Sequence, residues 1–374
     1  MRNLTQILTI LCACVALVGC GSDDSSTTDT GDAAAASDTT DGGDTTDGGD
    51  TTDGGDTTDG GDTTDGGDTT DGGDTTDGGD TTDGDPMDGW MEMESPVETE
   101  LTDIWGEAAG DLWAVGHTGT ILHQEEGSWT SQATGTTVDF FAVWGSGAQQ
   151  GDPTLFVTGD QGTVFIFDGQ EWSSANTGTD QPLTGICGSS GTDVWAMAAN
   201  GDMVHYDGQG WASAAGGVES IGAVWMLQDQ TAWAVGATAE GAPALLQRDG
   251  AAWPIFDASG SVGVGDTLND VWGSGVDSFW AAGATAEGQG LALHWDGAAW
   301  AVKFDPPTPL HGVWSADGGM TWFGTDEGVL RAQGDTATAT SLGKKINAVW
   351  GFSMTDVWAV GEDGAIFQKG PADM

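Results

Sequence analysis

The sequence predicts an all-β fold, a seven-bladed β-propeller over residues 88–374 that is preceded by a disordered acidic linker. Three observations predict it. One pattern of aromatic residues and Gly-rich turns occurs seven times after residue 100. Within it, short apolar runs alternate with Gly, Asp and Ser turns, and no stretch has a sustained helical period. The segment before it is rich in aspartate and has almost nothing apolar to bury.

The first twenty residues have a short cationic start and an apolar stretch too short to span a membrane comfortably. They end in Leu17-Val18-Gly19-Cys20, which resembles the lipobox of bacterial lipoprotein signal peptides. The resemblance implies that residues 1–19 are cleaved and that Cys20 is lipidated, so that the chain is attached to the membrane through this anchor. Gly21, where an aspartate would mark inner-membrane retention, favours an outer-membrane, surface-exposed location if the cell is Gram-negative.

Residues 20–87 form the predicted linker. From Asp38 to Asp83 an aspartate recurs at every third residue, separated by Thr-Thr or Gly-Gly. Such a segment cannot offset the entropy of ordering its backbone, so we expect a solvated spacer. Glycosylation of the threonine pairs and diffuse cation binding are the alternatives. The chain has 59 acidic and 7 basic side chains, which disfavours nucleic acid and anionic lipid surfaces as partners.

Three aromatic slots mark each repeat. The first slot holds Trp105, Trp144, Cys187, Trp225, Trp272, Trp314 and Trp350, spaced by 36 to 47 residues. The second slot holds Trp113, Phe156, Trp195, Trp233, Trp280, Trp322 and Trp358, and the third holds Trp129, Trp172, Trp211, Trp253 and Trp300. A unit of about 40 residues with about four short strands is typical of a propeller blade. Tryptophans that recur in nearly every blade are expected to pack in the core.

Trp90 belongs to this pattern although it precedes the first repeat. The seventh repeat ends without a fourth strand, whereas Asp88-Gly89-Trp90 matches the end of the Asp-Gly-x-x-Trp element. We therefore expect residues 90–95 to form the outermost strand of the last blade and to close the ring.

The strings WAVGHTGTILH and WAVGEDGAIF, together with the Asp-Gly-x-x-Trp turns, resemble propellers of the BNR/Asp-box type and of the photosystem II stability and assembly factor family. The resemblance covers residues 88–374 and implies the fold. A sialidase-like activity would need an arginine cluster and a tyrosine nucleophile, but the domain has two arginines and one tyrosine. A copper radical oxidase would need two tyrosines. No catalytic residue and no cofactor are expected.

Metal binding is also not expected. His123, His205 and His294 occupy one repeat position at the end of the third strand, so they should lie in different blades and not converge. Cys187 is the one cysteine left in the mature domain, which excludes an internal disulfide.

The candidate interaction residues come from departures from the repeat. Trp295 falls outside the three slots and shares its repeat position with Phe167 and Tyr206. Its side chain is expected to point away from that of His294, where an exposed aromatic residue would be a candidate for recognition. The fourth and fifth repeats each carry the insertion GATAEG, at Gly236–Gly241 and Gly283–Gly288, between the second and third strands. Adjacent long loops would build a raised lip that carries Glu240 and Glu287, with loop drift without function as the alternative.

Together these features predict a monomeric, surface-displayed module that binds an envelope or extracellular protein without catalysis. The alternative is a lectin-like, carbohydrate-binding or glycan-active propeller, and a third reading is an envelope protein without a specific ligand. Paired carboxyl groups with perturbed pKa values in a central cleft would favour an enzyme, and an exposed rim would favour a binding module.

Overall fold

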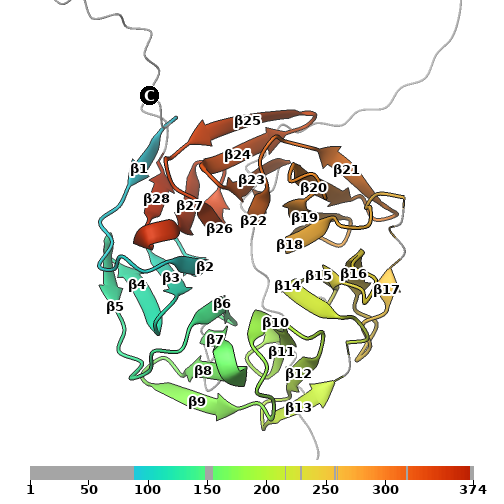
Figure 1. Cartoon of the computed structure of the whole chain (residues 1–374). Helices are drawn as coiled ribbons and strands as arrows, with labels where there is room; N and C mark the ends of the chain where they lie inside the picture. The colour runs from blue at the N-terminus through green and yellow to red at the C-terminus, as the bar shows by residue number, and fades with distance from the viewer. Residues whose placement is uncertain are drawn as a thin grey trace, which may run out of the picture. The chain divides into compact units, whose positions relative to one another are not determined.

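The computed structural model of the chain describes residues 88–147, 155–214, 216–227, 230–256, 258, 260–316 and 319–370. Within these residues, seven four-stranded antiparallel sheets form a ring around a central channel (Figure 1). The prediction of a seven-bladed propeller is confirmed. The predicted signal peptide, Cys20 and the linker all lie outside the described residues.

In six blades the strands follow chain order from the channel outward, and the last blade takes its outer strand from the N-terminal side. Blade 1 comprises β2 (Leu101–Ala108), β3 (Asp111–Gly116), β4 (Thr120–Glu125) and β5 (Ser128–Ser131), and blade 2 comprises β6 (Phe140–Gly145), β7 (Leu155–Gly159), η1 (Asp160–Gly162), β8 (Thr163–Phe167) and β9 (Trp172–Asn176). Blade 3 comprises β10 (Leu183–Ser190), β11 (Asp193–Ala198), β12 (Met203–Tyr206) and β13 (Trp211–Ala214), and blade 4 comprises β14 (Ser220–Met226), β15 (Ala232–Ala237), β16 (Pro243–Gln247) and β17 (Ile255–Phe256). Blade 5 comprises β18 (Thr267–Gly275), β19 (Ser278–Ala284), β20 (Gly290–Trp295) and β21 (Trp300–Phe304), and blade 6 comprises β22 (Leu310–Ala316), β23 (Met320–Thr325), β24 (Gly328–Gln333) and β25 (Thr336–Ser341). Blade 7 comprises β26 (Ile346–Ser353), β27 (Asp356–Gly361), η2 (Glu362–Gly364), β28 (Ile366–Lys369) and β1 (Trp90–Glu92).

The second strand of each blade is buried on both faces. In β3 and β27 every residue after the first aspartate is buried, because neighbouring blades cover both sides of the sheet. This explains the continuous apolar string Val-Trp-Ala-Val in place of alternation. The glycine that ends the string is required by close packing, since a Cβ atom at Gly116 would collide with the carbonyl oxygen of Glu100.

Pairs of tryptophans connect the blades. The second-slot residue of one blade packs edge-on against the third-slot residue of the next, as in Trp233 and Trp300, whose ring centroids lie 5.1 Å apart at 89°. The same contact joins Trp113 to Trp172, Trp195 to Trp253 and Trp358 to Trp129. Such edge-to-face pairs stabilise beyond the area that they bury, so the tryptophans of the second and third slots are packing residues, as predicted.

The ring is closed by β1. Trp90, Met91 and Glu92 pair antiparallel with Lys369, Gln368 and Phe367 of β28, and they complete the four-stranded sheet of blade 7. The strand is shorter than the predicted range 90–95. After Met93, whose N–H donates to the carbonyl of Ile366, the chain leaves the sheet in a turn. The Ser95 hydroxyl donates to the Val97 carbonyl within this turn, so residues 94–95 do not continue the ladder.

Candidate functional site

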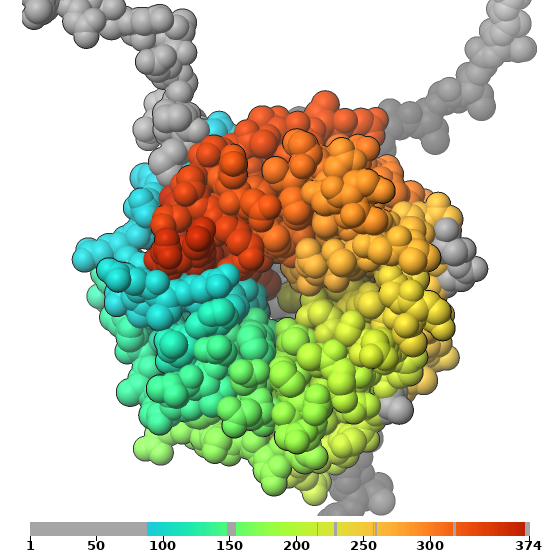
Figure 2. Space-filling view, in the orientation of Figure 1, coloured from blue at the N-terminus to red at the C-terminus, as the bar shows by residue number. Residues whose placement is uncertain are grey.

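Indole side chains line the central channel. Trp225 of blade 4 stacks on Trp272 and also contacts Trp350 across the ring, with ring centroids 5.8 Å apart in both pairs. Trp105 in turn lies 6.2 Å from Trp350. The first aromatic slot therefore points into the channel, and Figure 2 shows the narrow opening that the side chains leave. The cavity lined by the inner strands has a volume of about 150 Å³.

Two carboxyl groups, Asp103 of blade 1 and Asp270 of blade 5, line this cavity. Burial raises the pKa of Asp103 to about 8 and that of Asp270 to about 7. Each carboxylate bridges two blades. Asp103 accepts the N–H of Ile104 and, at 2.8 Å, the N–H of Val143 in blade 2. Asp270 does the same with Val271 and with Val313 of blade 6, also at 2.8 Å.

Other polar groups of the channel also join blades. The side chains of Thr102, Thr184, Asn269 and Asn347 donate to the carbonyls of Phe140, Ile221, Leu310 and Leu101 in the following blade. All four occupy one repeat position. These contacts were not predicted, because a hydrogen bond to the backbone of the next blade leaves no mark in the local sequence pattern. The polar side chains that line the channel thus hold neighbouring blades together.

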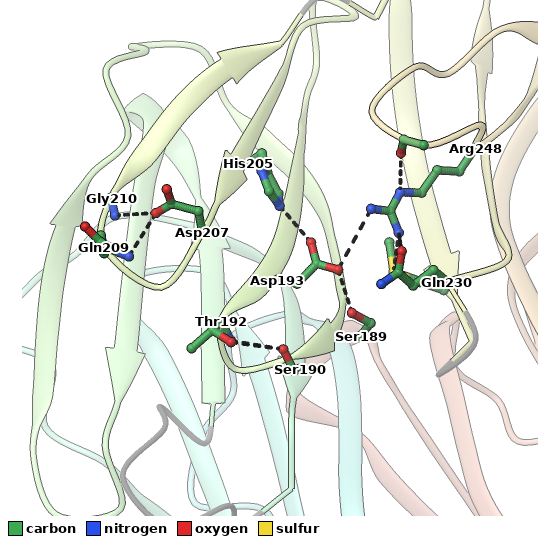
Figure 3. A network of polar contacts seen from close by, with 12 residues as sticks. Ser189, Ser190, Thr192, Asp193, His205, Asp207, Gln209, Gly210, Gln230 and Arg248 are labelled. Atoms are coloured by element: carbon green, nitrogen blue, oxygen red, sulfur yellow. Dashed lines mark hydrogen bonds and ion pairs between the residues drawn. The ribbon is translucent and has the colours of Figure 1, made fainter. Parts of the chain in front are cut away.

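A second polar cluster lies between blades 3 and 4, centred on Asp193 (Figure 3). The Ser189 hydroxyl donates to Asp193 at 2.5 Å, the His205 Nε2 lies 2.7 Å from the same carboxylate, and Arg248 of blade 4 approaches to 3.8 Å. Burial raises the pKa of Asp193, but the hydrogen bonds from Ser189 and His205 and the charge of Arg248 outweigh it and lower the pKa overall. The carboxylate stands between serine and histidine, so this is not a nucleophile and base in contact.

The Asp193 cluster is built on a tryptophan. Trp195 stacks on His205 at a centroid distance of 4.4 Å, and the Arg248 guanidinium lies 5.4 Å from the ring centroid of Trp195. Blade 1 repeats the stack, with Trp113 on His123, whose Nε2 lies 2.8 Å from Asp111. The histidines of the shared repeat position therefore stay apart in their own blades. Among the described residues, no group of three or more metal-ligating side chains could hold a metal ion.

The two GATAEG insertions are joined by the segment between blades 4 and 5. Each begins in the last two residues of β15 or β19 and continues into the loop before β16 or β20, so both lie at the predicted connection between second and third strands. The Gly265 N–H donates to the Gly241 carbonyl, and the Ala286 N–H donates to the carboxylate of Asp266 at 3.0 Å. We call residues 236–241, 263–266 and 283–288 the lip. Glu240 and Glu287 are both exposed on it.

An apolar groove adjoins the lip. It has a volume of about 430 Å³, and its walls come from β16, β17 and the connector between blades 4 and 5. It is lined by Ala242, Pro243, Ile255, Phe256, Val262 and Val264, among others. Val264 is 76% exposed and Ile255 is 49% exposed, so two large aliphatic side chains of this lining face solvent. We call this surface the blade-4 groove.

The exposed position expected for Trp295 is wrong. Trp295 is 6% exposed, packs against Trp233 and Trp300, and donates its Nε1–H to the carbonyl of Val276. Tyr206, at the same repeat position, is half-buried against Phe156 of the preceding blade. This position is a further aromatic slot between blades. Trp295 therefore offers no free face for recognition.

No family profile and no curated protein sequence matches this chain. Solved structures of similar fold do exist. YCF48 bound to D1 peptide matches with a TM-score of 0.60 at 15% identity, over 76% of this chain and 97% of that one. YCF48 from Cyanidioschyzon merolae matches with a TM-score of 0.59 at 14% identity, over 76% of this chain and all of that one (100%).

The extracellular domain of the one-component system BT4673 from B. thetaiotaomicron matches with a TM-score of 0.57 at 12% identity, over 74% of this chain and 40% of that one. At these identities the similarities show the fold. In the part of the chain that the structure describes, no helix is long and apolar enough to cross a membrane.

Proposed function

We propose that residues 88–374 act as a non-catalytic protein-binding module that uses the lip and the blade-4 groove. The observation that carries the proposal is the joining of two inserted loops and their connector into one structure beside an open apolar groove. Exposed contiguous apolar surface is uncommon on soluble proteins and marks interaction sites. That YCF48, a protein of the same fold, has been solved with a bound peptide supports a role of this kind.

We further propose that the module is displayed at the cell surface by the lipidated Cys20 and the acidic linker. The lipobox-like end of residues 1–20 supports the anchor, and the repeated aspartates support an extended spacer. The extracellular domain of BT4673 gives an example of this fold outside a cell.

A glycan-active propeller is the second candidate, because Asp103 and Asp270 face one cavity with raised pKa values. The cavity argues against it. Its volume of about 150 Å³ is smaller than the roughly 300 to 1,000 Å³ that is usual for ligand sites. In each carboxylate one oxygen accepts a backbone N–H of its own blade and the other accepts a backbone N–H of the next blade. The two residues therefore have a structural role, which is to hold neighbouring blades together.

Affinity capture with the full chain tests the proposal. Envelope proteins and glycans would be recovered with the wild type and with a variant in which loop residues 238–242 and 285–289 are replaced by the turn His117–Gly119 of blade 1, so that β15 and β19 keep their lengths. We expect specific proteins to be recovered by the wild type and lost by the variant at an unchanged melting temperature. Equal recovery of the same partners by both would refute a role for the lip. Recovery of glycans that Asp103→Asn and Asp270→Asn abolish would favour the second candidate.

A further inference from the structure

We propose that the blade-4 groove binds a cationic peptide segment that inserts an apolar side chain, while the lip carboxylates contact its lysine or arginine residues. This inference rests on the proposed function and specifies the chemistry of the partner.

The shape of the groove follows from a short outer strand. β17 pairs with β16 only at Leu245 and Leu246, whereas the outer strand of blade 6 pairs at six positions. The apolar side chains that a longer β17 would cover are therefore exposed. Pro243 lies two residues before Leu245 on β16, and because proline has no N–H, it opposes the addition of a further strand there. The groove is therefore suited to the insertion of a side chain.

The charge around the groove selects the sign of the partner. The lip, residues 236–241, 263–266 and 283–288, carries three acidic side chains and no lysine or arginine. Glu240 and Glu287 are exposed on the lip, and the Asp266 carboxylate is held next to them by the N–H groups of Gly263 and Ala286. A cationic segment would be attracted to this surface, and an anionic one would be repelled.

Other occupants fit less well. The chain has a formal net charge of −52. Its own linker and a second copy of the chain are both negatively charged, so the acidic lip would repel them. A sugar ring would need a free aromatic face. Phe256, the one aromatic residue of the lining, already contacts Trp233 and Trp295 at centroid distances of 5.3 and 5.2 Å. A peptide with lysine and an aliphatic residue matches both the negative charge of the lip and the apolar lining of the groove.

Fluorescence anisotropy with synthetic peptides tests the inference on the full chain. The probe is a labelled peptide of repeated Gly-Lys-Leu units, and the controls are Gly-Lys-Ser and Gly-Glu-Leu peptides of the same length. We expect the Gly-Lys-Leu peptide to bind about tenfold more tightly than the Gly-Lys-Ser peptide, since burying one aliphatic side chain is worth about this factor. The Gly-Glu-Leu peptide should show no binding.

The variants locate the site. Val264→Ser with Ile255→Ser should weaken the Gly-Lys-Leu peptide by about tenfold, whereas Val276→Ser, at a 51% exposed position in the opposite hairpin of blade 5, should not. Glu240→Gln with Glu287→Gln should weaken binding and reduce its salt dependence, and Glu126→Gln in the turn of blade 1 should not.

Three outcomes would overturn the inference: equal binding of the Gly-Lys-Leu and Gly-Lys-Ser peptides, unchanged binding in the groove variants, or a dimer of the chain that Val264→Ser abolishes. If the Gly-Lys-Leu peptide does not bind but proteins are captured by the wild type and lost in the loop variant, the cationic partner is rejected. The proposed protein-binding function is then still supported.

Discussion

The indole of Trp90 packs edge-on against the indole of Trp322, with ring centroids 5.5 Å apart and ring planes at 83°. This is the contact that second-slot and third-slot tryptophans make at other blade interfaces, although here the two residues are separated by most of the chain. Trp90 is 2% exposed. The ring is thus closed by a tryptophan that the N-terminal side of the domain contributes.

Removing this closure should destabilise the whole domain. Trp90→Ala deletes a buried aromatic side chain and should lower the free energy of unfolding by about 3–5 kcal/mol, measured by urea denaturation. Met91→Ala changes the next residue of the same strand, which is 53% exposed, and should have little effect. Deletion of residues 88–96 should lower the melting temperature sharply. An unchanged melting curve after this deletion would show that β1 does not close the ring.

The two channel carboxyls should make stability fall as pH rises. An aspartate in the unfolded chain has a pKa near 3.9, so raised values of about 8 for Asp103 and about 7 for Asp270 mean that the folded state disfavours ionisation. Their contribution is fully present below about pH 4 and is lost as pH rises through 7 and 8. Thermal unfolding at pH 5 to 9 should show this decline.

Variants at these positions should flatten the decline. Asp270→Asn cannot ionise, so its melting temperature should vary less between pH 5 and pH 9 than that of the wild type, whatever its absolute value. Carboxyl carbon chemical shifts would report the titrations directly. Midpoints below pH 5 for both groups would contradict the account of the channel.

The ion pair between Arg248 and Asp193, at the contact of blades 3 and 4, should contribute more to the free energy of unfolding than a shorter ion pair on the surface. Arg248 lies 3.8 Å from Asp193 with its side chain 8% exposed, whereas Lys344 lies 2.6 Å from Asp363 in a solvated setting. Arg248→Met should cost about 1–3 kcal/mol, because it leaves the Asp193 carboxylate without its cation. Lys344→Met should cost less than about 1 kcal/mol. Denaturation of both variants compares the pairs, and the reverse order would contradict the argument.

Cys187 should be chemically inert in the folded protein. It is fully buried, and burial raises the pKa of its thiol, so little thiolate is available to react. Iodoacetamide should modify it only after denaturation, as mass spectrometry would show. Rapid modification of the native protein would indicate that blade 3 opens readily.

The sequence made the ring predictable because its packing repeats. Aromatic slots recur in nearly every blade, and the match of Asp88-Gly89-Trp90 to the Asp-Gly-x-x-Trp element revealed the closing strand. The bridging role of Asp103 and Asp270 was not predictable, because only two blades carry an aspartate there and the partners lie on the next blade. Trp295 was misjudged because blades cover both faces of the third strand.

The candidate site was predictable in part. The two inserted loops stand out as departures from the repeat, and the structure joins them through Asp266. The blade-4 groove has no such signal. It depends on how few residues β17 contains and on the path of residues 260–264, which tertiary packing determines.

Site-specific photo-crosslinking tests the central claim most directly. A photoreactive amino acid would be introduced in the full chain at position 264 in the groove and, as a control, at the 51% exposed position 276 on the opposite face. The account predicts that a protein partner is crosslinked from position 264 and not from position 276, and that Glu240→Gln with Glu287→Gln reduces the yield. Equal crosslinking from both positions, or none from position 264 while partners are still captured, would contradict it.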